Sequence, residues 1–269
     1  MADDRLAVLD DEAARAGLPA GAFDRGWLAA HLAEERRTAS LLGEIREAIF
    51  GAQDGLVSTL AAVTIAAGAF NNQFPVLVAG IAVGLGGVFS MAAGEYMSSK
   101  SQNEIFEAQI VGEREEVAER PGEAEAEMAF MFEEDGLPAD ASASMARVIA
   151  QHPDVLLKTM IEKELGLTHG NAEGSPLQGA LVMGASFGIG SAVPILPYVF
   201  LDLGIATLAS VIATAAVLFA IGVVKSRWTR RSWWRSGAEI LVLGTVAGIA
   251  GFFFGNLLPG ILGVPAVSG

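Results

Sequence analysis

The chain has 269 residues, of which 52% are hydrophobic, and its mean hydropathy of +0.46 is too high for an ordinary soluble domain. Its net charge of −14 must therefore be confined to polar segments, and this charge argues against nucleic acid and anionic lipid as partners and in favour of cations. The chain has no cysteine, which excludes disulfides and thiolate metal sites.

Residues 1–45 are polar and mostly typical of helix, and we expect them to form a cytoplasmic helical extension. No basic stretch followed by an apolar run opens the chain, so we expect no cleaved signal peptide. The run GEIREAIF at residues 43–50 predicts an amphipathic helix on the membrane surface.

Five stretches are long and apolar enough to span a bilayer, which requires about 20 residues. They are residues 50–70, 74–98, 177–200, 203–225 and 237–262. A short polar joint connects the first stretch to the second, and another connects the third to the fourth. These joints predict two helical hairpins. The chain is therefore expected to be an all-α polytopic membrane protein with five transmembrane helices, arranged in two blocks at residues 46–98 and 177–269.

Basic residues indicate the orientation of these helices, because cytoplasmic loops carry an excess of Lys and Arg. They lie before the first stretch, after the second, and between the fourth and fifth: Arg36, Arg37 and Arg46; Lys100; Lys225, Arg227, Arg230, Arg231 and Arg235. The pattern predicts a multi-pass protein of a bacterial-type cytoplasmic membrane. Its N-terminus and the long polar segment after the second helix are expected on the cytoplasmic side, and its C-terminus on the other.

The first membrane-spanning stretch contains Asp54, about one turn inside it. An ionisable residue at that depth is costly, and it usually faces a protein interior or a water-filled path where it binds a cation or a proton. In the second stretch Met91 and Glu95 are four residues apart and share a helical face. A site with carboxylate and thioether ligands suits Fe²⁺ better than Mg²⁺ or Ca²⁺. Packing for Met91 and a simple interfacial position for Glu95 are the alternatives.

Residues 99–176 form an acidic segment in which a helical metal-binding domain is expected, inserted between the second and third transmembrane helices. Its glutamates occur in pairs on helical faces, and a Met-x-x-x-Glu pair lies on its last predicted helix. The candidate ligands are Glu113, Glu116, Glu123, Glu127, Met160 and Glu164. Carboxylates gathered from different helices repel one another unless a cation lies between them. The alternative is a solvated acidic surface. No nucleophile–base set and no phosphate-binding loop occurs in the chain, so we expect no enzyme activity.

Two motifs resemble those of the vacuolar iron transporter (VIT) family. They are REAIFGAQDGLVS at residues 46–58 and SMAAGEY at residues 90–96, and PILPY at residues 194–198 fits the family's third helix. The resemblance covers roughly residues 44–262. It implies a five-helix homodimer in the lipid bilayer that carries Fe²⁺, and other divalent metals such as Mn²⁺, Co²⁺ or Zn²⁺, out of the cytosol in exchange for protons. The metal would be substrate and bound ion, and no catalytic cofactor is implied.

The resemblance also assigns roles to individual residues. It implies that the pathway aspartate and methionine are Asp54 and Met91, and that the cytoplasmic metal ligands are Glu113, Glu116, Glu127, Met160 and Glu164. Two positions depart from the family pattern, because Val83 and Ala124 stand where other members carry glutamate. Residues 1–45 are too short for the ferritin-like domain of some bacterial relatives, so no di-iron oxidase site is expected.

Two functional hypotheses remain. The first is an exporter of divalent metal. The second is a membrane-anchored protein that binds, buffers or senses iron without transport. Asp54 and Met91 favour the exporter, because a pure anchor has no use for an aspartate deep in the membrane.

Overall fold

The computed structural model describes residues 25–166, 175–229 and 231–262, and every regular element in these ranges is an α-helix. The predicted all-α class is therefore confirmed for this part of the chain. Residues 1–24 of the predicted N-terminal extension lie outside the described residues. The helices are α2 (Arg25–Ala69), α3 (Gln73–Glu119), α4 (Pro121–Glu134), α5 (Ala139–Ala150), α6 (Pro153–Glu164), α7 (Pro176–Phe200), α8 (Leu203–Thr229) and α9 (Trp233–Leu262).

Helices α2 and α3 are much longer than a membrane span, with 45 and 47 residues. At 1.5 Å per residue such a helix extends for about 70 Å, whereas the hydrocarbon core of a bilayer is about 30 Å thick. Each helix therefore continues without a break from its apolar part into its polar part. The surface helix expected before the first span is the middle of α2, and the boundary expected at residue 98 falls inside α3.

The ends of α3 explain its length. Asn72 caps the start of the helix, and its side-chain oxygen accepts a hydrogen bond of 2.9 Å from the Phe74 N–H. The polar part after residue 98 consists largely of good helix formers, so nothing stops the helix before Arg120. Pro121 then restricts the residue before it, and a new helix begins there.

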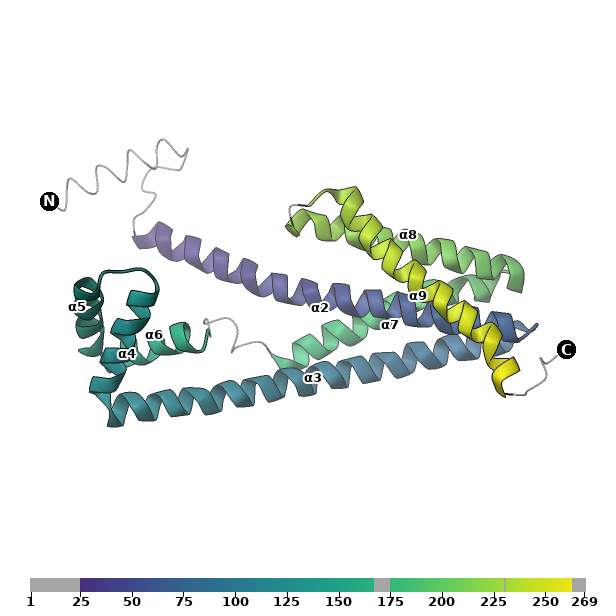
Figure 1. The fold of residues 1–269 in the computed structure, drawn as a ribbon. Helices are drawn as coiled ribbons and strands as arrows, with labels where there is room; N and C mark the ends of the chain where they lie inside the picture. Colours follow the sequence, from purple (N-terminus) through teal and green to yellow (C-terminus); the bar gives the residue numbers. More distant parts are fainter. Residues whose placement is uncertain (1–24, 167–174, 230, 263–269) are drawn as a thin grey trace, which may run out of the picture.

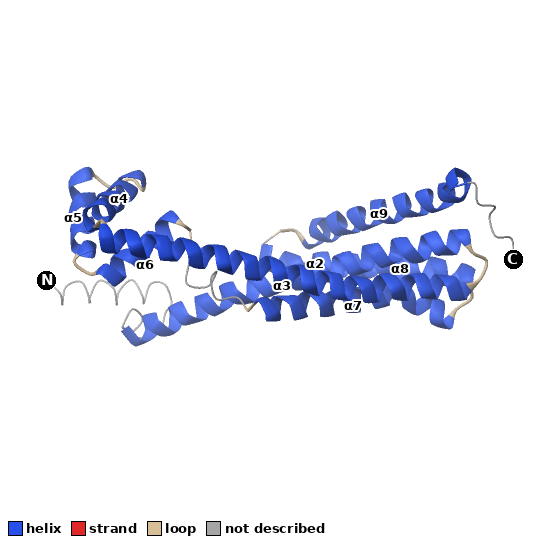
Figure 2. Ribbon diagram, turned by 90° about the horizontal axis from the view of Figure 1, so that it is seen from below, coloured by secondary structure: helices blue, strands red, loops and turns tan. Residues whose placement is uncertain are grey.

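Helices α2, α3, α7 and α8 are each long and apolar enough to cross a membrane. Helix α7 packs against both α2 and α3, while α8 and α9 pack against each other and against α2 (Figures 1 and 2). Helix α2 contacts all four of the other long helices, and α7 touches both α2 and α3, the helices that carry the predicted pathway residues.

The three short helices α4, α5 and α6 gather around the far end of α3, away from α7, α8 and α9 (Figure 1). They share a small hydrophobic core whose members all come from residues 117–160: Val117, Ala124, Met128, Phe132, Ala146, Leu156 and Met160. We call this unit the acidic domain. Helices α4 and α6 are followed by the left-handed glycines Gly136 (φ 99°) and Gly166 (φ 63°).

Candidate metal pathway and acidic domain

The glycines beside Asp54 set how α2 lies on α7. A Cβ atom added to Gly51 would come within 2.6 Å of the Met183 main-chain oxygen, and one added to Gly55 would overlap the main-chain oxygen of Phe187. The two backbones are therefore almost in contact, as small residues allow in membrane proteins. This contact fixes Asp54 at the level of Phe187.

Helix α3 approaches α7 in the same way. A Cβ atom on Gly87 would overlap the Phe187 ring, and one on Gly184 would lie 3.0 Å from the Ala92 Cβ atom. Met91 and Glu95 follow Gly87 at intervals of four residues, so they lie on the same stripe of α3. Both side chains are half-buried. The predicted pathway residues of α3 thus lie on its α7-facing side.

A carboxylate that we did not predict as a site residue, Glu47 of α2, meets Glu95 at the start of α7. A Cβ atom on Gly179 would lie 3.1 Å from Glu47 Oε2 and 3.4 Å from Glu95 Oε1, so the two side chains converge over this buried glycine. Ser99 Oγ donates a hydrogen bond of 2.7 Å to Glu95 Oε1. The sequence does contain a signal for Glu47, because it precedes Asp54 by seven residues, or two helical turns, and therefore shares its face.

These contacts place Glu47 and the three predicted pathway residues at successive levels along α7. Glu95 and Glu47 lie at Gly179, the turn containing Met91 lies near Gly184, and Asp54 lies near Phe187. The eight residues from Gly179 to Phe187 rise about 12 Å. We call this series, from Glu47 and Glu95 through Met91 to Asp54, the carboxylate–thioether ladder.

The Asp54 carboxylate at the inner end of the ladder is half-buried. Ser58 Oγ donates a 2.6 Å hydrogen bond to the main-chain oxygen of Asp54, not to its side chain. No hydrogen bond or ion pair to the Asp54 carboxylate is present among the described residues. The carboxylate is therefore available to a cation or a proton.

In the acidic domain, three helices bring four of the predicted glutamates together in pairs. Glu113 and Glu116 lie near the end of α3, Glu127 lies on α4, and Glu164 ends α6. The carboxyl of Glu113 faces that of Glu164, and the carboxyl of Glu116 faces that of Glu127. A pocket of about 400 Å³ opens beside them, lined by Ala126, Glu127, Phe130, Met131 and Glu164.

The surroundings of these pairs favour protonation or a bound cation. Burial, together with the neighbouring Glu116 carboxyl, raises the pKa of Glu127 to about 7. Burial and the nearby Glu164 also raise the pKa of Glu113. Glu113 Oε2 and Glu116 Oε1 are buried and receive no hydrogen bond, because their neighbours are other carboxyl groups. A divalent cation would neutralise both pairs.

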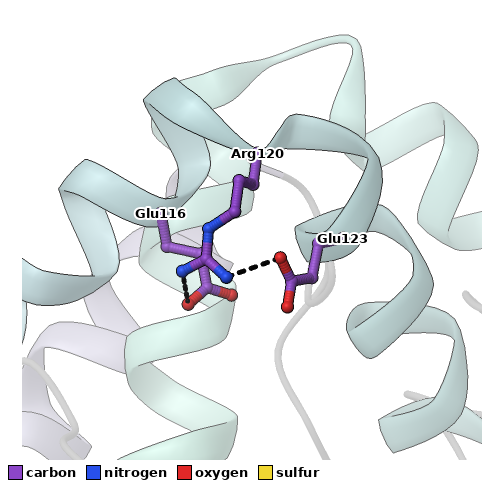
Figure 3. A network of polar contacts seen from close by, with 3 residues as sticks. All are labelled: Glu116, Arg120 and Glu123. Atoms are coloured by element: carbon purple, nitrogen blue, oxygen red, sulfur yellow. Dashed lines mark hydrogen bonds and ion pairs between the residues drawn. The ribbon is translucent and has the colours of Figure 1, made fainter.

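The remaining predicted ligands are placed differently. The exposed carboxylate of Glu123 binds Arg120, which also binds Glu116 (Figure 3). Met160 is fully buried in the core of the acidic domain, one turn before Glu164. Ala124, where the resemblance implies a glutamate in other family members, is also fully buried in this core. In the part of the chain that the structure describes, no three His, Cys, Asp or Glu side chains are arranged to hold one metal ion.

Comparison with proteins of similar sequence identifies the class of protein to which this chain belongs. The family model described as the VIT family matches residues 45–256. The chain is 31% identical over 224 residues to vacuolar iron transporter 1 of Arabidopsis thaliana, an alignment that covers 82% of this chain and 88% of the relative. It is 30% identical over 212 residues to vacuolar iron transporter 1 of Eucalyptus grandis, covering 78% of this chain and 85% of the relative. A vacuolar iron transporter of Toxoplasma gondii is 27% identical over 239 residues, covering 86% and 79%.

The apolar helices and these relatives together define a multi-pass membrane protein of the transporter class, not an enzyme. The chain belongs to the VIT family, as the motifs around Asp54 and Met91 predicted.

Proposed function

We propose that this protein moves Fe²⁺, and other divalent metals such as Mn²⁺, Co²⁺ or Zn²⁺, out of the cytosol in exchange for protons. The carboxylate–thioether ladder is the observation that carries the proposal, because it brings side chains able to bind metal to successive levels along α7. The names of the relatives, which are vacuolar iron transporters, support iron as a substrate.

The chemistry of the ladder couples metal to protons. A carboxylate binds a divalent cation only when it is deprotonated, so metal entry releases protons and protonation releases metal. Glu47 and Glu95 would receive the ion, Met91 would add a soft ligand that favours Fe²⁺ over Mg²⁺ and Ca²⁺, and Asp54 would hold the ion deeper in the membrane. Val83 offers no further carboxylate on α3, so Asp54 and the Glu47–Glu95 pair would carry the exchanged protons.

The acidic domain would collect metal at the cytoplasmic entrance. Its ligands would be the paired glutamates Glu113, Glu116, Glu127 and Glu164, with Met160 and Glu123 as further contributors. Clustered negative charge raises the local concentration of cations. The domain would therefore increase the supply of metal to the ladder.

The proposed topology has five spans, with α9 as the fifth, in a bacterial-type cytoplasmic membrane. The acidic domain and the N-terminus lie in the cytoplasm, as the basic residues around the α8–α9 connection support. The working unit would be a homodimer, because one copy leaves Asp54 only half-buried and a second copy packed there would shield it from lipid.

The paired glutamates alone also suit a membrane-anchored protein that buffers or senses iron. Uptake into proteoliposomes separates the two functions. A transporter accumulates Fe²⁺ in amounts that grow with time and with luminal volume, and an external chelator does not remove this metal. A buffer binds a fixed number of ions per protein, and the chelator strips them. Stoichiometric, chelator-sensitive binding alone would overturn the transport proposal.

A further inference from the structure

Arg120 joins two of the predicted ligands at the corner between α3 and α4. It is the last residue before the α4 helix, and its guanidinium group lies between Glu116 of α3 and Glu123 of α4 (Figure 3). Its Nη1 atom lies 2.6 Å from Glu123 Oε2, and its Nη2 atom lies 3.1 Å from Glu116 Oε2. One guanidinium group therefore neutralises a carboxylate from each helix.

Glu116 is both a partner of Arg120 and a proposed metal ligand. Its Oε2 atom accepts the hydrogen bond from Arg120, while its Oε1 atom is buried and receives no hydrogen bond, and the Glu127 carboxyl lies beside the Glu116 carboxyl. Only 22% of the Glu116 side chain is exposed, so little water is available to replace a lost partner. A cation on the Glu127 side and the guanidinium on the other side would compete for the same carboxylate charge.

The guanidinium is a fixed competitor, because arginine stays protonated at any physiological pH. It would also repel a divalent ion bound to Glu116 across the width of one carboxylate. Another arginine of the domain provides a contrast. Arg147 lies 4.0 Å from Glu125, and its side chain is 71% exposed, so it forms only a weak surface pair.

We propose that Arg120 sets the metal affinity of the acidic domain by acting as a tethered cation. It holds Glu116 and Glu123 when no metal is bound, and a divalent ion must weaken this pairing to bind Glu116. The inference rests on the proposed metal binding by Glu116. Its functional consequence is a domain that releases metal toward the ladder instead of retaining it.

The test is Mn²⁺ binding to the purified full-length protein, measured by titration calorimetry at pH 7.5. Removing the competitor in Arg120→Gln should tighten Mn²⁺ binding by roughly three- to tenfold, the range expected for loss of exposed ion pairs. Arg120→Lys, which keeps the charge but loses the forked geometry, should fall between this variant and the wild type. Arg147→Gln is the matched control and should bind as the wild type does.

Whether Mn²⁺ binding becomes tighter or weaker in the Arg120 variants distinguishes a competing cation from a purely structural residue. If Arg120 only held the helix corner in place, its loss would weaken binding, so unchanged or weaker binding in both Arg120 variants would overturn the proposal. Arg120→Lys retains the corner contact and keeps the test valid if Arg120→Gln is unstable. Glu116→Gln tests the premise: if this variant binds Mn²⁺ as tightly as the wild type, Glu116 is not a ligand and the Arg120 proposal fails. If only the Arg120 variants fail to tighten binding, the domain's role stands.

Discussion

At the scale of single residues, Gly179 shows how the absence of a side chain shapes the proposed pathway. Its Cα lies beneath two carboxylates, and a methyl group there would sit 3.1 Å from Glu47 Oε2 and 3.4 Å from Glu95 Oε1. We predict that Gly179→Ala lowers metal flux roughly tenfold at low metal, equivalent to ~1.4 kcal/mol of lost binding. Gly43→Ala is the control, because nothing lies within 4 Å of its added Cβ atom. Equal flux in both variants would show that metal does not pass between Glu47 and Glu95.

Met91 allows the ligand role to be separated from packing. Leucine preserves the volume of methionine and removes only the thioether, so a packing residue should tolerate Met91→Leu with little change. We predict a several-fold loss of Fe²⁺ and Co²⁺ flux and a smaller loss of Mn²⁺ flux, because the harder Mn²⁺ gains less from sulfur. Flux of the three metals should be compared in parallel liposomes. An equal loss for all three would argue against direct ligation by sulfur.

Some of the residues in the proposed site could be predicted from the sequence, and others could not. Asp54, Met91 and Glu95 were predicted because polar atoms are conspicuous in apolar stretches. Glu47 lies outside the apolar stretch, so only its two-turn spacing from Asp54 indicated that it shares a helical face with Asp54. The binding of Arg120 to both Glu116 and Glu123 depends on how the chain turns between α3 and α4, which spacing along one helix does not reveal.

At the scale of elements, the raised pKa of Glu127 makes the acidic domain sensitive to pH. Its pKa of about 7 in the folded domain exceeds the ordinary value of 4.5, so the folded state binds the proton more tightly than the unfolded state. The contribution to stability is full below about pH 4.5 and is lost as the pH rises through 7. Discounted for the partial exposure of Glu127, the effect is on the order of 1 kcal/mol, or roughly 4–8 °C in melting temperature.

Circular dichroism melting of a fragment covering residues 99–176 tests this linkage, because the domain core lies within residues 117–160. The metal-free fragment should melt at a higher temperature at pH 5 than at pH 7.5. Glu127→Gln, which is neutral at both values, should reduce the difference. If the wild type and the variant show the same pH dependence, Glu127 does not titrate as the structure indicates.

The paired glutamates also predict a specific kinetic defect. Substituting Glu113, Glu116, Glu127 and Glu164 by Ala together should slow metal flux several-fold at low metal and have little effect at saturating metal, because the domain supplies the ladder and is not part of it. The same variant fragment should lose the rise in melting temperature that metal causes in the wild type. A flux defect of equal size at all metal concentrations would place the glutamates in the pathway itself.

Helix boundaries followed the sequence where proline and glycine mark them, at Pro121, Gly136 and Pro153. Where only the hydropathy changes along the chain, the helix boundaries did not coincide with the ends of the apolar stretches. Helices α2 and α3 extend beyond their apolar stretches, because the polar residues that precede the stretch in α2 and follow it in α3 are also good helix formers. Met160 was predicted as a ligand from its spacing to Glu164, and the packing of α6 places it in the core, where the thioether also contributes to stability.

At the scale of the whole molecule, the two proposed metal-handling regions lie on different parts of α3, because Met91 and Glu95 are near the middle of this helix and the acidic domain is at its end (Figure 1). The ladder lies beside α7, and the acidic domain surrounds the end of α3 near Glu119. An unbroken stretch of α3 connects the two regions.

The most direct test of the central claim follows metal and protons together in proteoliposomes with an acidic lumen. A metal-sensitive dye and a pH-sensitive dye inside the vesicles report both fluxes. For the wild type we predict that Fe²⁺ uptake is faster than without the pH gradient and is accompanied by a rise in luminal pH. Asp54→Asn, which keeps the shape of the side chain but cannot ionise, should abolish both signals at matched protein density. Wild-type metal uptake in the Asp54→Asn variant would contradict the account.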